Sequence, residues 1–494
     1  MDLQSRKAGI LLHPTSLPGG EYNGELGEEA FHFVDFLTEC GIKVWQVLPL
    51  GPTLDDKSPY QCLSAHAGEP RLISFSKLCA KQWLNVNEYG AYVEKENKTY
   101  HDKQAQLTFS FLQFSEKADE NDKQAYLSFK NQHGNWLDDY ALFCVLREKF
   151  DHRSWTDWPV ELRDRVVSSL TDVQEKYEGE IELVRFTQFI FFQQWMAIKH
   201  YANDKGISIF GDLPLFVAHD SADVWSNRKM FKLDKAGHTT VVAGVPPDYF
   251  SATGQRWGNP VFDWDNIESD DFSWWVSRLK SQVELFDLIR IDHFRGLEAY
   301  WEIPATDETA LNGVWVPGPK EKFFEAINRH FNNGITLVAE DLGLITDEVH
   351  ALRENFTLPG MKILQFAFDE YHDGSNPYLP HNHESLSVVY TGTHDNDTTL
   401  GWFNSLNDHM KAQVYSYFGE TQETMPWMFV RAAFASVACL AVIPMQDILE
   451  LDGSHRMNTP GTTEGNWRWR FQWQQVDRSS IASRLQSYSN LYQR

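Results

Sequence analysis

"DLIRIDHFRG", residues 287–296, is a short apolar run that ends in closely spaced charges. Its apolar first half is typical of a buried strand. Side chains two residues apart on a strand share a face, so we expect Arg290 and Asp292 to point the same way. A guanidinium beside a carboxylate favours the ionised carboxylate. On its own the stretch fits either a structural ion pair or a reactive carboxylate, because buried ion networks also perturb pKa values.

Other short apolar segments of this kind recur along the chain, and amphipathic stretches lie between many of them. The strand candidates are 9–14, 43–50, 207–217, 287–294, 335–342, 361–368, 387–395 and 440–445, and the helix candidates are 26–40, 273–285, 319–332 and 426–438. Strands that alternate with helices indicate a parallel sheet, and about eight such units indicate a closed barrel. We therefore predict an α/β fold, a (β/α)8 TIM barrel, as one domain over residues 1–494. A doubly wound open sheet is the alternative, but no GxGxxG or GxxxxGK[ST] motif supports it.

Two long segments interrupt the alternation of strands and helices. Residues 51–206 separate the second and third strands and are too long for a loop. They contain strong helix patterns at 134–150 and 180–204, so we predict an inserted, mainly helical subdomain. Residues 218–272 are a second predicted insertion, and its Gly- and Pro-rich part, 244–260, is predicted to be a shaped loop at the active-site face.

Composition narrows the class of protein. With 44 Lys and Arg against 69 Asp and Glu, the net charge of −25 argues against nucleic acid or an anionic membrane as a partner. The five cysteines are scattered and odd in number, which is typical of a reduced protein. The longest apolar run, 432–445, is shorter than the roughly 20 residues of a membrane span. We therefore expect a soluble, cytoplasmic protein.

Acidic residues and histidine collect where four strand candidates end. A barrel of this type places its active site at the carboxyl ends of its strands, so these residues should converge. Crowded carboxylates repel one another, and folds tolerate them mainly where chemistry requires them. The residues are Asp212 after the third strand, Arg290 and Asp292 after the fourth, Glu340 and Asp341 after the fifth, and His394 and Asp395 after the seventh.

A cluster of Asp, Glu and His at strand ends can also bind a metal ion, but the spacings of these residues do not match known metal-binding motifs. The first strand offers only His13 and not an HxH pair, residues 394–398 lack the glycine and terminal glutamate of an EF-hand, and HExxH is absent. We therefore predict no metal and no other cofactor.

Without a metal, paired carboxylates are suited to the cleavage of glycosidic bonds, in which one carboxylate attacks and another protonates the leaving oxygen. We assign Asp292 as the nucleophile, kept ionised by Arg290. Glu340 is assigned as the acid, because neighbouring carboxylates and an apolar strand end favour its protonated form. Asp395 is expected to bind sugar hydroxyls and hold the ring distorted. The 18 Trp and 18 Tyr offer flat rings on which sugars stack.

Several long motifs carry a family resemblance over almost the whole chain. They include "GILLHPTSLPGG" (9–20), "SPYQCLSAHAGEP" (58–70), "GDLPLFVAHDSADVW" (211–225), "VAGVPPDYFSATGQRWGNP" (242–260) and "VVYTGTHDNDTTLGW" (388–402). The chain resembles the α-amylase clan and, within it, the 4-α-glucanotransferases (amylomaltases, or disproportionating enzymes). The resemblance implies retaining transfer of α-1,4-glucan segments from maltooligosaccharides to glucose or to another glucan, through a covalent glycosyl-aspartate.

The resemblance also implies roles for individual residues. Asp292 is the implied nucleophile, Glu340 the acid/base and Asp395 the stabiliser of the transition state. The implied donor-sugar residues are Tyr60, Asp212, Arg290, His394 and Asn458, and the implied acceptor-side residues are Asp248, Gln255 and Trp257.

The chain departs from the family pattern at a few positions. Asp55 stands where the family commonly has an aromatic residue, which weighs against a remote glucan-binding site that uses that ring. His66 and Glu69 stand where Phe and Asn are expected, beside the site but outside the catalytic set.

Two other functions remain as alternatives. An α-glucan hydrolase shares the first half-reaction and the same residues. A non-catalytic glucan-binding protein is disfavoured, because such a protein need not retain Asp292, Glu340 and Asp395 together.

Overall fold

The computed structural model describes most of the chain. The described residues are 5–20, 23–85, 87, 90, 100–247, 251–332, 334–368, 374–419 and 422–494.

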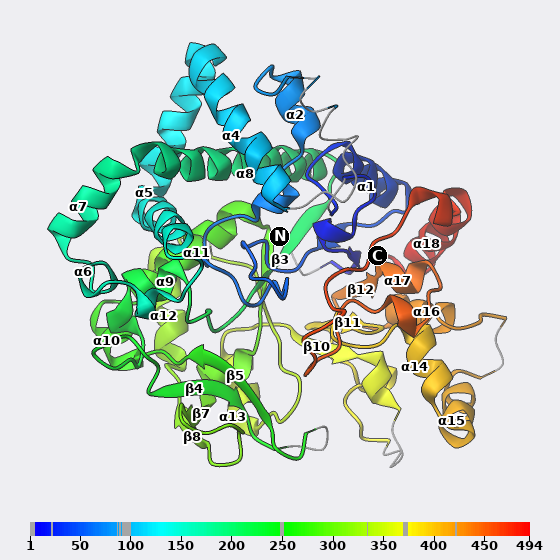
Figure 1. Ribbon diagram of the computed structural model, residues 1–494. Coiled ribbons are helices and arrows are strands. Elements are labelled where there is room, and N and C mark those ends of the chain that lie inside the picture. The colour runs from blue at the N-terminus through cyan, green and yellow to red at the C-terminus, as the bar shows by residue number, and fades with distance from the viewer. Residues whose placement is uncertain are drawn as a thin grey trace.

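A parallel eight-stranded sheet forms the centre of the molecule (Figure 1). Its strands are β1 (Lys7–Leu11), β2 (Val44–Gln46), β3 (Ser208–Leu213), β6 (Leu288–Ile291), β9 (Leu337–Ala339), β10 (Gly360–Ile363), β11 (Ser387–Tyr390) and β12 (Leu440–Pro444). Their spatial order is β10-β11-β12-β1-β2-β3-β6-β9. This order follows the chain around a barrel, so each of the eight predicted strands and the (β/α)8 fold class are confirmed.

Individual contacts join β9 to β10, the two end strands of the sheet. Ala339 N donates to Pro359 O at 2.9 Å, and Met361 N donates to Asp341 Oδ1 at 2.7 Å. A side chain thus supplies an acceptor at the seam of the barrel.

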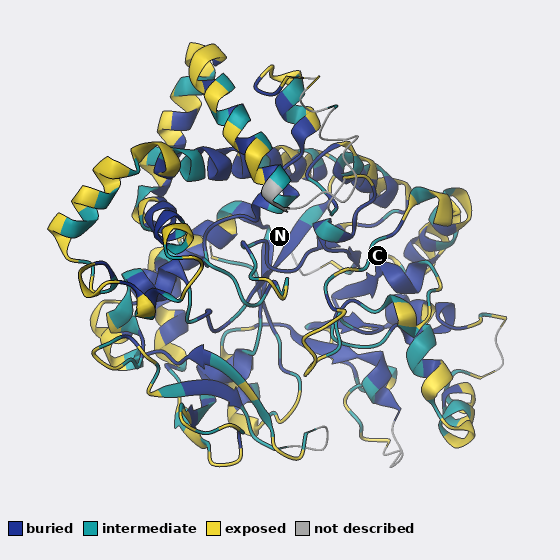
Figure 2. Cartoon of the chain, viewed as in Figure 1, coloured by how far each residue is buried: buried dark blue, intermediate teal, exposed yellow. Residues whose placement is uncertain are grey.

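Helices cover the outside of the barrel with their apolar faces turned inward (Figure 2). Helix α1 (Glu28–Glu39) buries Ala30, Phe33, Val34 and Leu37, which recur at helical spacing on one face. The predicted helices 26–40, 273–285, 319–332 and 426–438 are confirmed. They correspond to α1, α11 (Ser273–Leu285), α12 (Glu321–His330) and α16 (Trp427–Ala435), joined in the outer layer by α13 (Asp347–Asn355), α14 (Thr399–Ser405), α15 (Asp408–Phe418), α17 (Met445–Ile448) and α18 (Arg478–Tyr492).

A group of helices lies between β2 and β3, where the sequence predicted an insertion (Figure 1). The helices are α2 (Phe75–Ala80), α4 (Tyr100–Lys117), α5 (Glu120–Lys149), α6 (Val160–Arg163), α7 (Val167–Lys176) and α8 (Glu178–Asp204). Helix α5 begins fourteen residues before the predicted start at residue 134. The Asp119 side chain caps it by accepting from Asp122 N at 2.9 Å, and its first half is largely exposed, so no apolar periodicity marked it.

The prediction of a loop over 244–260 is wrong at both ends. Strands β4 (Val241–Val245) and β5 (Gln255–Pro260) join β7 (Ala299–Pro304) and β8 (Val314–Pro317) in an antiparallel sheet of order β5-β4-β7-β8. The β4–β5 register shifts between Val242 and Gly244, and such a bulge obscures the alternation that identifies strands. Helices α9 (Ala222–Ser226) and α10 (Trp264–Ser269) flank this hairpin in the chain. Asp248 lies outside the described residues.

None of the described helices combines the length and the apolar character needed to cross a lipid bilayer.

Candidate active site

A buried ion pair lies at the carboxyl ends of β3 and β6. The strand register pairs Asp212 with Arg290. Arg290 Nη1 donates to Asp212 Oδ1 and Oδ2 at 2.8 and 2.7 Å, and Nη2 donates to Asp292 Oδ1 at 2.9 Å. The expected contact between Arg290 and Asp292 is therefore confirmed. Because the Asp292 side chain is 28% exposed while those of its two partners are almost fully buried, Asp292 is the member of the group that solvent reaches.

Glu340 lies next to Asp292, at the end of the neighbouring strand. The parallel register pairs Ile291 with Ala339, so the two acids occupy the next position on adjacent strands, and such strands lie about 4.8 Å apart. His293 N donates to Glu340 Oε2 at 2.7 Å, and Leu342 N donates to Oε1 at 3.0 Å. His293 adopts left-handed backbone angles, with φ of 52°, and its N–H binds Glu340. The residue after Asp292 thus fixes the carboxyl group of Glu340.

Tyr60 and His394 extend the buried network around Asp212. The Tyr60 hydroxyl donates to Asp212 Oδ2 at 2.8 Å and lies 2.8 Å from His394 Nε2. Because the single hydroxyl proton goes to the carboxylate, His394 Nε2 is assigned as the donor to Tyr60. The two rings stack with centroids 5.3 Å apart, and Trp467 lies 6.0 Å from each. No sequence signal singled out Trp467.

The Asp395 carboxylate is fixed by a hydrogen bond from Asn458 and is partly open to solvent. Asn458 Nδ2 donates to its Oδ1 at 2.6 Å, yet the Asp395 side chain is 45% exposed. Arg456 donates to the backbone oxygens of both residues, at 2.9 Å for Asp395 and 3.0 Å for Asn458. Sequence reasoning missed Arg456, although it lies only two residues before the predicted Asn458.

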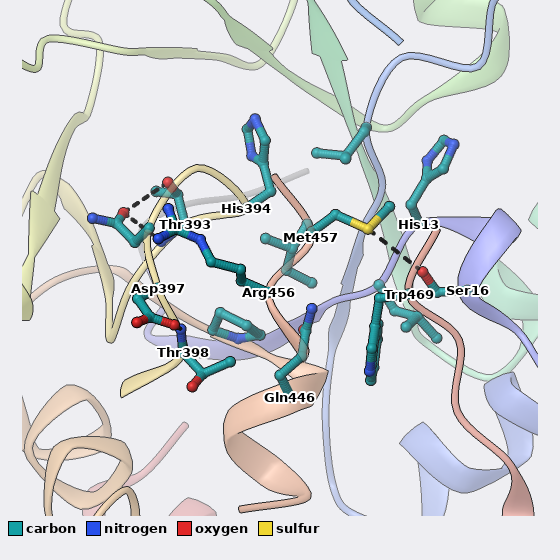
Figure 3. Close-up of a pocket in the computed structure, with 15 residues that line it drawn as sticks. His13, Ser16, Thr393, His394, Asp397, Thr398, Gln446, Arg456, Met457 and Trp469 are labelled. Atoms are coloured by element: carbon teal, nitrogen blue, oxygen red, sulfur yellow. Dashed lines mark hydrogen bonds between the residues drawn. The ribbon is translucent and has the colours of Figure 1, made fainter. Parts of the chain in front are cut away.

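A small pocket lies beside His394, at the ends of β1, β11 and β12 (Figure 3). His13, Met457 and Trp469 are among its lining residues, and Arg456 borders it. Its volume of about 30 Å³ is enough for water. His394 is one of the residues that line this pocket.

The pKa values of the two acids are both raised. Burial raises the pKa of Asp292 to about 8, against the opposing effect of Arg290, and nearby carboxylates add to the rise. Burial also raises the pKa of Glu340, as expected for a general acid. Arg290 does lower the pKa of Asp292, as expected, but burial outweighs it, so the net pKa is raised rather than lowered. The adjacent acids therefore retain a proton near neutrality.

Trp257, in β5, contacts the site through the side chain of His293. Its ring meets the His293 ring edge-on, with centroids 4.8 Å apart, and its Nε1 donates to Gln255 Oε1 at 3.2 Å. Gln255 and Trp257 therefore lie beside His293, the residue whose N–H binds Glu340.

The residues that depart from the family pattern lie outside this network. Asp55 is exposed, whereas His66 is buried with its Nδ1 2.8 Å from Ser281 Oγ. Glu69 Oε2 accepts from Thr53 N at 2.9 Å. Asp341, predicted at the rim with Glu340, binds Met361 N instead.

Comparison with known proteins identifies the family. The family model described as 4-alpha-glucanotransferase matches residues 12–476. The chain belongs to the 4-alpha-glucanotransferase family. A 4-alpha-glucanotransferase of Thermus thermophilus is 48% identical over 476 residues, covering 94% of each chain. One from Synechocystis is 44% identical and covers 100% of this chain and 99% of the relative.

Two solved amylomaltase structures share the fold of this chain. Amylomaltase from Streptococcus agalactiae in complex with acarbose superposes with a TM-score of 0.95 at 35% identity, covering 99% of this chain and 100% of that one. Amylomaltase from Corynebacterium glutamicum shares the fold with a TM-score of 0.79 at 17% identity, covering 99% of this chain and 75% of that one. Membership of this family makes the chain a glucan-transferring enzyme rather than a binding protein.

Proposed function

We propose that this chain transfers segments of α-1,4-glucan from maltooligosaccharide donors to glucose or to other α-1,4-glucans, by retaining double displacement on Asp292. The observation that carries the proposal is the pairing of Asp292 with Glu340 at one level of adjacent strands, joined through His293 N. Retaining glycosidases need two carboxyl groups about 5–5.5 Å apart, one as nucleophile and one as acid.

In the first half-reaction Glu340 protonates the glycosidic oxygen while Asp292 attacks the anomeric carbon. Arg290 binds Asp292 Oδ1, so we assign the attack to Oδ2. The C–O bond to the leaving sugar breaks as the aspartyl ester forms, and the leaving chain departs with the Glu340 proton. The proton of the acid pair resides on Glu340 in the reactive form, because only Asp292 contacts the cation.

The donor sugar is assigned to the surface formed by Tyr60, Arg290, His394 and Asp395. Asp395 supplies an exposed carboxylate for sugar hydroxyls, and Asn458 holds it. Hydrogen bonds that tighten as the ring flattens lower the barrier, because they are stronger in the transition state than in the ground state.

In the second half-reaction the ionised Glu340 removes a proton from the acceptor hydroxyl, which attacks the same carbon and releases Asp292. Gln255 and Trp257 support an acceptor site beside Glu340, and Asp248 is assigned to it from the family resemblance alone. A Trp257 ring that holds a sugar at this position also displaces water. A hydrolase that uses the same site is the alternative. The reaction uses side chains alone as acid, base and nucleophile, so it needs no metal or cofactor.

Maltotriose distinguishes transfer from hydrolysis. Transfer releases glucose and longer chains with the total of reducing ends constant, whereas hydrolysis raises that total. We expect glucose release at constant reducing ends. Reducing ends that rise in step with glucose would identify a hydrolase.

Asp292→Asn is the matched control for this assay. The amide cannot form the ester, so glucose release should fall by about ten-thousandfold or more. An unchanged thermal midpoint of unfolding would show that the fold is retained, and ordinary activity in the variant would refute the assignment.

We also propose that the chain works in a reducing compartment, the cytoplasm. All five cysteines are free thiols in the structure, as a reducing environment would keep them.

A further inference from the structure

Trp315, in β8, stands apart from the other tryptophans. All 18 lie in the described part of the chain, and Trp315, at 39% exposure, is the only one of them that is exposed. Leu344, 56% exposed, is near it in space, because Arg295 contacts both residues. Two large apolar side chains are thus exposed around the Arg295 side chain.

The Trp315 ring is held in place rather than free to move. The Arg295 guanidinium stacks on it, with its carbon 3.9 Å from the ring centroid, and Trp301 packs against it with centroids 5.2 Å apart at 68°. Arg295 is only 7% exposed, and Trp301 Nε1 donates to Ala310 O at 2.9 Å. Rings fixed in this way lose little conformational entropy when a ligand stacks on them.

Arg295, one of the two supports of Trp315, belongs to the loop that follows the proposed nucleophile. Arg295 follows Asp292 by three residues and donates to the carbonyl of Leu344. Leu344 follows Glu340 by four residues. Through Arg295, Trp315 is therefore linked to the loop that follows Asp292 and to the loop that follows Glu340. Glu340 is the group that protonates the leaving oxygen, so its loop borders the sugars that leave and the acceptor that replaces them.

We propose that Trp315 and Leu344, here called the Trp315 platform, bind the outer sugars of an α-1,4-glucan acceptor. This inference rests on the proposed function and names the length of acceptor that the site prefers. The occupant is a neutral chain with apolar C–H faces, which suits an aromatic ring and a leucine flanked by a buried guanidinium. A glucose acceptor fills only the position next to Glu340, whereas a longer chain also reaches the platform.

The test uses the full-length enzyme with maltotriose as donor and two acceptors labelled at the reducing end, maltose and maltoheptaose. Three variants are compared with the wild type. Trp315→Ala removes the ring, and Trp315→Phe keeps a flat ring. Val314→Ala trims the neighbouring side chain, which is 57% exposed on the opposite face of β8.

We expect Trp315→Ala to raise the KM for labelled maltoheptaose about three- to tenfold, the effect of losing one aromatic contact. Its kcat, and both constants for labelled maltose, should stay within about twofold of the wild type. Trp315→Phe should recover most of the affinity, and Val314→Ala should match the wild type.

Three results would overturn the proposal. An unchanged KM for maltoheptaose in Trp315→Ala would show that the ring does not bind the chain. Equal losses with both acceptors would show that Trp315 only supports Arg295. A wild-type dimer that Trp315→Ala dissociates in sedimentation would show that the platform is covered by a second copy of the chain. Glucose release from maltotriose reports the proposed function separately, so a variant that keeps it while failing these tests refutes the platform alone.

Discussion

One guanidinium serves two carboxylates: Arg290 donates twice to Asp212 through Nη1 and once to Asp292 through Nη2. Because its single positive charge is shared, it does not offset the burial of Asp292, whose pKa is raised to about 8. The site therefore holds a nucleophile whose charge is balanced only in part.

Arg290→Lys tests this sharing, because a compact ammonium keeps the charge but cannot contact both carboxylates in the fixed geometry of a guanidinium. We expect kcat for maltotriose to fall about a hundredfold or more, with the midpoint of unfolding lowered as well. A kcat within about threefold of the wild type would show that charge alone matters at position 290.

Glu340→Gln should slow maltotriose far more than a glycosyl fluoride donor, whose leaving group needs no proton. It should also remove the alkaline limb of the pH–rate profile, where the wild type loses the proton that its raised pKa retains on the acid. The measurement is formation of the glycosyl-enzyme from each donor as a function of pH. Equal slowing of both donors would exclude Glu340 as the general acid.

Asp341→Ala should weaken the seam between β9 and β10. The change leaves Met361 N without its acceptor and Arg353 without a carboxylate 3.4 Å away, both buried. We expect a loss of roughly 3–5 kcal/mol in the free energy of unfolding. Because Glu340 adjoins Asp341, kcat should fall too. Asp341→Asn retains an oxygen for Met361 N and is the matched control: a loss as large as that in the alanine variant would assign the effect to charge rather than to the seam.

Asp223→Asn should change how stability depends on pH. The Asp223 carboxylate accepts from Ala65 N at 2.7 Å, and burial raises its pKa to about 6. Since the folded pKa lies above the unfolded value, the wild type loses stability as pH rises through about 4 to 6. The asparagine variant lacks this ionisation, so its free energy of unfolding relative to the wild type should rise by about 3 kcal/mol over that window. Urea unfolding at pH 4 and pH 7 measures the change, and a constant difference would contradict it.

Local patterns were enough to predict the barrel and the contact between Arg290 and Asp292. Apolar runs mark strands, and the spacing of two residues fixes the face on which both side chains lie. The second partner of Arg290 depends on which strands are neighbours, since Asp212 is 78 residues away in sequence. The pKa of Asp292 is raised chiefly by burial, and then by Asp212 and other carboxylates that lie close to it only in the fold, so the sequence alone led to the wrong direction.

The roles of two adjacent acidic residues, Glu340 and Asp341, were harder to predict from the sequence. Spacing alone does not distinguish Glu340 from Asp341, and only the position of Met361 shows that Asp341 turns toward the seam. The antiparallel sheet was missed because β8 is four residues long and largely exposed, and because β4 and β5 are offset by a bulge. Arg456 acts through backbone oxygens, and a search for catalytic side chains does not look for such contacts.

The pairing of β2 with β3 has a consequence for synthesis on the ribosome. Val44 pairs with Ser208, so about 160 residues of helical insertion are translated before β2 meets its second neighbour. At roughly 5–20 residues per second this takes about 8–30 s, during which one edge of β2 is unpaired. A nascent chain paused within the insertion thus presents an open strand edge, and a chaperone that shields such edges would protect this protein most at that stage of translation.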